Sequence, residues 1–362
     1  MKNSFGTNIS MTLFGESHGP YIGITLDGLP AGFSIDLAAI QKDLDQRKPK
    51  NSLSTARQEE DDFKISSGYF NGHTTGTPLT IVIENKKQHS KDYSDTRFFL
   101  RPSHADFTAF EKYHGFQDYR GGGHFSGRLT ACIVAAGSIC RQILAKQGIL
   151  IGSHIERIAS VSDEPFSLDP DTLASQIEKM NTLDFAVLQN EKAMQNEIIK
   201  ASKNRDSVGG IIETAIIHVP TGLGEPFFDS VESILSHLLF SIPAVKGVSF
   251  GDGFGITSLR GSQANDAFEV KDDIIQTRSN HNGGINGGIS NGMPILIHTA
   301  IKPTPSIFQS QQTVQYNTKE EINYSIQGRH DPCIVHRARV VIDCIVAFGI
   351  LDLLMSYKAV QL

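Results

Sequence analysis

Residues 119–145 read YRGGGHFSGRLTACIVAAGSICRQILA, in which three glycines precede a long apolar run. Apolar side chains recur there at helical spacing (Leu129, Ile133, Ala136, Cys140 and Ile143), so we expect a buried helix that begins near Ser126. The stretch VVIDCIVAFGILDLL at 340–354 repeats this arrangement behind GRHDP at 328–332. Both stretches place glycine, a basic residue and a capping residue ahead of an apolar helix, which predicts two similar halves.

Periodicity and capping residues predict the other elements. Four helices are expected: one over 37–47 with Asp36 as N-cap, one from Ser126, one over 228–241, and one from Pro332 to Tyr357 with Asp331 as N-cap. Four strand-like runs lie between them, at 22–26, 79–84, 211–219 and 295–300. Helices and strands do not alternate regularly, so the predicted class is α+β. Because no linker interrupts the chain, we expect residues 1–362 to form one domain.

Composition excludes several classes of protein. The chain has 33 Lys and Arg against 39 Asp and Glu, a net charge of −6, which argues against nucleic-acid binding. The opening MKNSFGTNIS lacks an apolar signal region. Asp343 and Asp352 would be costly in a bilayer, so 340–354 is expected to be a buried helix and no membrane association is expected. The cysteines show no C-x-x-C spacing, which favours reduced core thiols in a cytoplasmic protein (Cys132, Cys140, Cys333 and Cys344).

Two histidines lie in motifs that could transfer protons. His18 lies in Gly15-Glu-Ser-His-Gly19, where flanking glycines allow a ligand to approach closely. His104 lies two residues from Asp106, a carboxylate that could orient its ring and raise its pKa, as suits a general acid. Each motif also has a plain structural interpretation: a turn with a solvated histidine in the first, a surface salt bridge in the second.

Glycine-rich segments with cations predict an anion site. The glycines at 121–123 lead into a helix start beside Arg120 and Arg128, which favours phosphate or carboxylate. The segment matches neither the P-loop nor a dinucleotide fingerprint. SNHNGGINGG at 279–288, followed by KPTPS at 302–306, offers a second set of backbone donors and a lysine. The acidic run 59–62 is interpreted as a solvated loop, and no metal site is expected.

The motifs, in this order, resemble the chorismate synthase family. The resemblance spans nearly the whole chain and rests on the following segments: GESHG at 15–19, RPSHAD at 101–106, YRGGG at 119–123, DSVGG at 206–210, GLGEP at 222–226, AVKG at 244–247, SNHNGG at 279–284, KPT at 302–304 and GRHDP at 328–332. It implies a β-α-β sandwich with long helices between antiparallel sheets, assembled as a homotetramer.

The resemblance also implies a reaction. The family converts 5-enolpyruvylshikimate 3-phosphate into chorismate and inorganic phosphate by a 1,4-anti elimination that needs reduced FMN without net redox change. His18 would donate a proton to the departing phosphate, His104 would act near flavin N1, and Asp331 would relay a proton at flavin N5. Arginines would bind the substrate anions (Arg47, Arg120, Arg128 and Arg329). FMN would meet His124, Ser126, Pro243, Ala244, Gly287, Lys302, Pro303, Thr304, Pro305, Ser306 and Arg329.

The chain departs from the family pattern at a few positions. Gln46-Arg-Lys-Pro-Lys50 replaces a more basic loop, His124-Phe125 replaces Arg-Ser, Pro243 replaces Asn, and Asp343 replaces Glu. NADPH is one candidate source of reducing equivalents, and an external reductant is the other. Two further functions stay open at this point: an FMN-dependent oxidoreductase acting on a small anionic metabolite, and a non-enzymatic binder of phosphorylated metabolites.

Overall fold

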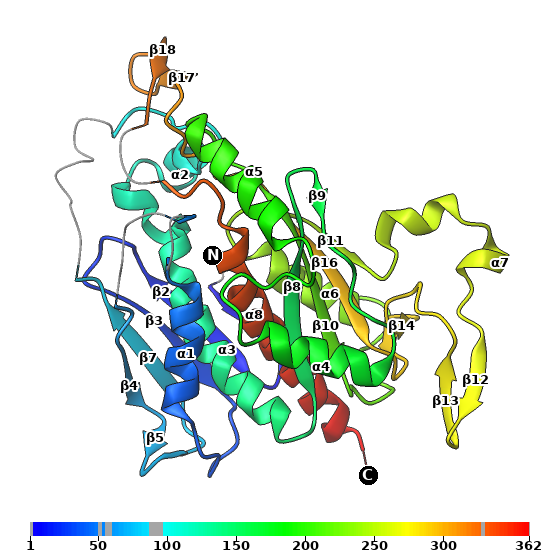
Figure 1. Cartoon of the computed structure of the whole chain (residues 1–362). Helices are drawn as coiled ribbons and strands as arrows, with labels where there is room; N and C mark the ends of the chain where they lie inside the picture. The colour runs from blue at the N-terminus through cyan, green and yellow to red at the C-terminus, as the bar shows by residue number, and fades with distance from the viewer. Residues whose placement is uncertain (1–2, 50–52, 55–59, 87–96, 327–329, 362) are drawn as a thin grey trace.

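Two five-stranded antiparallel sheets enclose the long apolar helices (Figure 1). The computed structural model describes residues 3–49, 53–54, 60–86, 97–326 and 330–361. The first sheet has the order β1 (Ser4–Phe5), β2 (Ser10–Gly15), β3 (Tyr21–Asp27), β7 (Leu79–Glu84) and β4 (Phe63–Ser67). The second has the order β11 (Val245–Phe250), β16 (Ile295–Ile301), β10 (Gly210–Ile217), β8 (Leu150–Ile158) and β9 (Val161–Ser162).

Short two-stranded ribbons extend from this frame. They are β5 (Tyr69–Phe70) with β6 (His73–Thr74), β12 (Phe268–Lys271) with β13 (Ile274–Thr277), β14 (Ile285–Asn286) with β15 (Ile289–Ser290), and β17 (Gln311–Gln315) with β18 (Glu320–Tyr324). The β12–β13 ribbon projects from the body of the molecule together with α7 (Figure 1).

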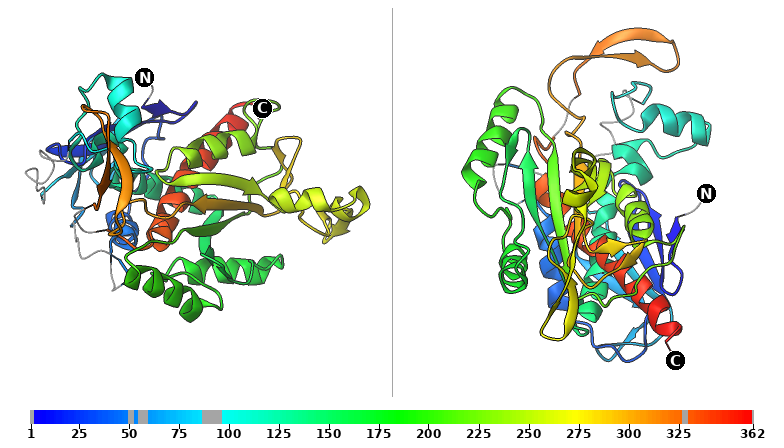
Figure 2. Two further views of the ribbon diagram at one scale, coloured as in Figure 1. Left: turned by 90° about the horizontal axis from the view of Figure 1, so that it is seen from above. Right: turned by 90° about the vertical axis from the view of Figure 1, so that its right-hand side faces the viewer.

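The helices comprise a central layer, an outer layer and short connections. They are α1 (Leu37–Arg47), α2 (Asp106–Tyr113), α3 (Thr130–Ala145), α4 (Pro170–Met180), α5 (Glu191–Lys203), α6 (Val231–Phe240), α7 (Gly261–Ala264) and α8 (Val335–Ala359), with 3-10 turns η2 (Arg120–Phe125), η3 (Gly127–Leu129) and η4 (Gly253–Ser258). Helices α4 and α5 cover the outer face of the second sheet, opposite α8 (Figure 2).

The core lies where the two central helices meet. Helix α3 packs on β3 and β7 of the first sheet, α8 packs on β8 and β10 of the second, and the two helices pack against each other. A Cβ at Gly137 of α3 would lie 2.3 Å from the carbonyl oxygen of Cys344 in α8, so only glycine permits this approach. Each half is thus an antiparallel sheet followed by an apolar helix, which confirms the predicted α+β sandwich.

The two apolar helical segments, Gly127–Ala145 and Val335–Ala359, are long and apolar enough to cross a membrane by length and composition. In each, 83% of the apolar window is buried inside the fold, so these are interior helices, as predicted for 340–354. The carboxylates of α8 are paired: Asp343 accepts from Arg339 and Ser153, and Asp352 accepts from the backbone N–H of Asn8 at 2.7 Å. Pairing explains how charged groups are tolerated there.

Most predicted elements are confirmed, and one capping assignment is wrong. Asp36 caps α1, its carboxylate accepting from the N–H groups of Ala38 and Ala39. The third predicted helix begins at Val231, three residues later than expected, behind the N-cap Ser230. Asp331 does not cap α8, which begins at Val335 after Ile334. Its carboxylate instead accepts from Arg337 Nη1 at 2.5 Å, because this cation in the first turn of the helix competes for it.

Candidate active site

The loop that carries His18 connects β2 to β3 and packs on the triple-glycine segment. His18 is only 4% exposed, and its Nδ1 lies 3.0 Å from Ser17 Oγ. Ser17 N donates to Gly123 O at 3.1 Å, and Ser17 Oγ donates to Gly121 O at 3.1 Å. A Cβ at Gly121 would lie 2.1 Å from His18 Cε1, so glycine is required for the ring to sit there. The first and third sequence motifs therefore form one structure.

The glycine segment itself is a strained turn rather than a regular helix. Gly121, Gly122 and Gly123 have φ angles of 56°, 86° and 53°, a region that disfavours other residues. His124 Nδ1 donates to Gly15 O at 2.8 Å, which ties the turn to the end of β2. Ser126 Oγ accepts from Arg128 N at 3.3 Å and so caps η3. The turn thus leads directly into the helical start predicted as an anion site.

Two of the predicted substrate arginines lie together and buried. Arg47 and Arg128 are 7% and 8% exposed, and both donate to the carboxylate of Asp61, Arg47 at 3.1 Å. Arg47 Nε also donates to Thr130 Oγ1 at 2.9 Å, and Arg128 Nε donates to Asn85 Oδ1 at 3.0 Å. We call Arg47, Asp61, Asn85 and Arg128 the arginine cluster.

Asp61 is a residue that the sequence interpretation missed. The run 59–62 was expected to be a solvated loop, yet Asp61 is 3% exposed and pairs with two guanidinium groups. Its neighbour Asp62 does behave as expected, pairing at the surface with Lys86 at 2.7 Å. The difference arises because the two arginines approach from α1 and η3, and one buried carboxylate neutralises part of their charge.

Arg120 differs from these arginines because its side chain is 37% exposed. It forms a two-point pair with Asp118, with Nε–Oδ1 and Nη2–Oδ2 distances of 2.8 Å. Bonding to Asp118 raises the pKa of Arg120, and the same pair lowers the pKa of Asp118. Of the predicted substrate cations, Arg329 lies outside the described residues, as does Lys50.

A second group of predicted residues gathers around His104. His104 Nε2 lies 2.8 Å from Ser306 Oγ, and its Nδ1 donates to Pro102 O at 3.0 Å. Lys302 Nζ donates to Ser103 O at 2.7 Å, and Ser207 Oγ donates to Thr304 O at 2.6 Å. We call His104, Lys302, Thr304 and Ser306 the His104 cluster. It joins the RPSHAD, DSVGG and KPTPS motifs, with Pro303 and Pro305 in the same loop.

The electrostatics at His104 contradict the expected pKa. Asp106 bonds Arg101 in two places, at 2.8 and 2.7 Å, rather than the histidine. Burial and the nearby Arg101 lower the pKa of His104 to about 4. The imidazole is therefore neutral at pH 7, with a proton on Nδ1 and Nε2 free to accept from Ser306. The expectation of a raised pKa was wrong because the arginine takes the carboxylate.

Asp331 lies on a series of contacts that joins the two clusters. It pairs with Arg337, whose Nε donates to Arg47 O at 2.8 Å. The next residue, Pro332, accepts at its carbonyl from Val208 N at 2.9 Å, and Val208 adjoins Ser207 of the His104 side. Arg337 was not predicted as a site residue, since its position inside a helical pattern gave no sign of these partners.

The remaining predicted FMN residues divide between two places. Ala244 O accepts from Lys302 N at 3.0 Å, and the exposed Pro243 precedes it, so both lie beside the His104 cluster. Gly287 lies in the β14–β15 ribbon beside the start of α6, where Val231 N donates to Gly288 O at 2.9 Å. The ribbon lies before β16 in the chain, and Lys302 lies directly after β16. The length of β16 is about 20 Å. Gly287 therefore lies toward the opposite end of β16 from Lys302.

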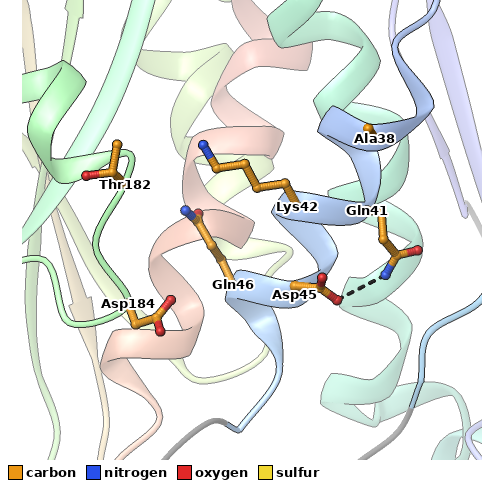
Figure 3. A pocket seen from close by; sticks show the side chains of 7 residues that line it. All are labelled: Ala38, Gln41, Lys42, Asp45, Gln46, Thr182 and Asp184. Carbon is orange, nitrogen blue, oxygen red and sulfur yellow. Dashed lines mark hydrogen bonds between the residues drawn. The ribbon is translucent and has the colours of Figure 1, made fainter.

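A separate cavity of about 380 Å³ lies between α1 and residues 182–184. Figure 3 shows its lining, with Lys42 and Gln46 of α1 turned toward Thr182 and Asp184, and Asp45 bonded to Gln41. No predicted site residue lines it. Gln46, one of the departures from the family pattern, donates to Asn181 O at 2.8 Å and accepts from Arg339 at 3.1 Å. It therefore supports α1 against its neighbours.

Known proteins resemble the chain along its length. The family model for chorismate synthase matches residues 9–355. A chorismate synthase of Thermococcus kodakarensis is 43% identical over 354 residues, covering 98% of each chain. One of Dehalococcoides mccartyi is 46% identical over 355 residues, covering 98% of this chain and 96% of its own. A crystal structure of chorismate synthase superposes with a TM-score of 0.76 at 26% identity, covering 98% of this chain and 93% of that one.

These matches define the class of protein first: the chain is a carbon–oxygen lyase that acts on a phosphate ester. More particularly, it belongs to the chorismate synthase family, which confirms the resemblance found in the sequence. It converts 5-enolpyruvylshikimate 3-phosphate into chorismate and phosphate, and the family implies reduced FMN as cofactor. The oxidoreductase and the non-enzymatic binder are not favoured.

The His104 cluster fits such a cofactor on its own chemistry. Thr304 Oγ1 and His330 Nε2 are buried without a hydrogen-bond partner among the described residues. The His330 ring lies 5.0 Å from that of Phe308, just beyond the KPTPS loop. Unsatisfied buried polar atoms are uncommon and each calls for an explanation. With the ammonium of Lys302 in the same loop, the Thr304 hydroxyl offers a hydrogen bond and positive charge to an anionic, polar group such as FMN.

Proposed function

We propose that the elimination of phosphate takes place where the His18 loop, the glycine segment and the arginine cluster meet. The observation that carries this proposal is the contact of His18 with Gly121, which puts a buried imidazole on the segment that leads to Arg128. We also propose that residues 1–362 act as one domain, because a single hydrophobic core includes side chains of both sheets and of α3 and α8.

His18 donates a proton to the departing phosphate in this scheme. Its burial excludes water, and Ser17 orients the ring through Nδ1. Arg47 and Arg128, with Arg120 and Arg329, bind the two carboxylates and the phosphate of the substrate. Guanidinium groups suit these anions because their planar fork makes paired hydrogen bonds. The exposed Arg120 is the described arginine best placed to meet an incoming anion.

Residues of the His104 cluster would hold reduced FMN, with Ala244 and Pro243 beside them and His124 and Ser126 on the glycine segment. When bound, the cofactor supplies transient electron density for the loss of a hydrogen that no carbonyl acidifies. The neutral His104 accepts a hydrogen bond at Nε2 and holds its own proton at Nδ1. Asp331 relays a proton between the two clusters, and Arg337 orients its carboxylate. Gly287 joins the cofactor site only if another part of the assembly brings it there.

We further propose a cytoplasmic homotetramer that acts on small molecules, without nucleic acid or membrane partners. The acidic net charge of −6 supports the absence of a nucleic-acid partner. NADPH is the candidate source of reducing equivalents. Its consumption by the purified protein with FMN alone, measured at 340 nm, would distinguish self-reduction from an external reductant.

Turnover tests the proposed function directly. The purified protein, incubated anaerobically with 5-enolpyruvylshikimate 3-phosphate and photoreduced FMN, should release one phosphate per chorismate while the flavin returns to its reduced state. Stoichiometric flavin oxidation would instead indicate an oxidoreductase. Binding of the substrate by folded protein without phosphate release would reject the lyase.

A further inference from the structure

Asn85 lies between the two groups to which the proposed function assigns the departing phosphate. It directly follows β7, and its N–H donates to Pro20 O at 3.1 Å, which continues the β3–β7 pairing by one step. Its side-chain Nδ2 donates to Glu16 O at 3.0 Å and to Gly19 O at 2.9 Å. Its Oδ1 accepts from Arg128 Nε at 3.0 Å.

The two carbonyl groups bracket His18. Glu16 and Gly19 are the two ends of the turn that holds Ser17 and His18, and Gly19 N donates back to Glu16 O at 3.0 Å. One amide group therefore fixes both ends of this turn and, at the same time, the guanidinium of Arg128. Arg128 is buried, so its Nε needs an acceptor.

A carboxamide suits this position better than the other side chains of its size. It carries two donors on nitrogen and an acceptor on oxygen, and both kinds are used here. An aspartate would keep the acceptor for Arg128 but would face two carbonyl oxygens without a proton. A leucine of similar volume would leave the guanidinium and both carbonyls unsatisfied. Sequence interpretation gave Asn85 no role, because all these partners come from the fold.

We propose that Asn85 is a positioning residue that sets His18 and Arg128 in one fixed geometry. This inference rests on the proposed function, in which His18 protonates the leaving phosphate and Arg128 binds the anion. A proton donor and a cation that act on one group must be held together closely, since small displacements of reacting groups cost large factors in rate.

The experiment compares Asn85→Ala and Asn85→Asp with the wild-type protein and a matched control, Asn181→Ala. Asn181 is also a partly buried asparagine, donating from Nδ2 to Ile151 O at 3.1 Å, but it lies at the end of α4. Each protein is assayed for phosphate release with reduced FMN, for FMN affinity by flavin fluorescence, and for melting temperature. The combination His18→Ala with Asn85→Ala completes a double-mutant cycle.

We expect Asn85→Ala to lower kcat/KM about tenfold to a hundredfold, the range for the loss of one or two buried hydrogen bonds. FMN affinity should stay within about twofold, and Asn181→Ala should lower the melting temperature without changing the kinetics. Asn85→Asp keeps its bond to Arg128, so it should lower kcat more than it raises KM. In the His18→Ala background the loss in kcat should shrink to less than about threefold, because one of the two positioned groups, the proton donor, is gone.

Two results would overturn the inference while leaving the proposed function in place. One is unchanged kinetics of both Asn85 variants although His18→Ala loses most of its turnover. The other is full additivity in the cycle, which would mean that Asn85 does not act through His18. Unchanged turnover of His18→Ala would overturn both the inference and the role of His18. If Asn85→Ala does not fold, the near-isosteric Asn85→Asp tests the inference instead. A decrease in kcat larger than the increase in KM supports it, and the reverse overturns it.

Discussion

The arginine cluster and the His104 cluster bury polar groups in opposite ways. In the first, the guanidinium groups of Arg47 and Arg128 already share Asp61, with Thr130 and Asn85 as further acceptors. In the second, Thr304 Oγ1 has no partner among the described residues. An unsatisfied buried group costs about 1–3 kcal/mol. The first region is therefore organised before any ligand binds, whereas we expect a ligand to complete the second.

The largest effect that this difference predicts is on turnover. His18 belongs to the organised region, so His18→Ala should lower kcat by roughly 10²–10⁴-fold, the range for a positioned general acid. Most of the proposed FMN contacts lie in the other region, so FMN binding should persist. Phosphate release and flavin fluorescence measure the two effects separately. A variant with normal turnover would remove His18 from the mechanism, and a variant that loses FMN would show that the regions are not separate.

The next effect concerns stability. Asp61→Asn removes the carboxylate that two buried guanidinium groups share, so the free energy of unfolding should fall by about 3–5 kcal/mol. Urea denaturation measures this change. Asp62→Asn is the matched control, because that carboxylate is exposed and pairs only at the surface with Lys86 and should matter little. Equal losses in the two variants would mean that the arginine cluster does not depend on its buried carboxylate.

A smaller effect is expected in the ligand-completed region. Ser306→Ala removes the hydroxyl that meets His104 Nε2, and we expect FMN to bind about tenfold more weakly, as for the loss of one hydrogen bond. The melting temperature without FMN should change little. Ser175→Ala is the control, since Ser175 bonds only within α4, to Asp171 O at 3.0 Å. FMN affinity equal in both variants and the wild type would separate this serine from the cofactor site.

The smallest effect is a dependence of stability on pH. Burial and Arg101 lower the pKa of His104 from 6.5 to about 4, so the folded state binds fewer protons than the unfolded state between these values. Stability should therefore fall as the pH is lowered from about 6.5 to about 4. His104→Gln cannot titrate and should show a shallower fall. Urea denaturation at pH 7 and pH 5 gives the free energy of unfolding at each pH. The same decrease between the two pH values in the variant and the wild type would contradict the lowered pKa.

The comparison also shows which parts of the molecule were accessible from the sequence. Local signals were sufficient for α1, α3, α8 and the main strands, because a capping aspartate and apolar periodicity are readable over a few residues. Family resemblance gave His18 its role as proton donor, but its close approach to the triple glycine at Gly121 was not predicted. The partners of Asp61, Asn85 and Arg337 were not predictable, since each bonds groups from several distant segments. The pKa of His104 was misjudged because Arg101, also within the motif, takes the carboxylate.

Because α3 and α8 approach closely at Gly137, each half of the chain depends on the other to complete its folding. Each helix is buried on almost every side, partly by its own sheet and partly by the other helix. A fragment ending in the exposed turn at 146–148 would therefore display a bare apolar strip, as would its complement. Both helices must therefore be synthesised before either half can bury its apolar strip. The two fragments should become soluble only when they are co-expressed.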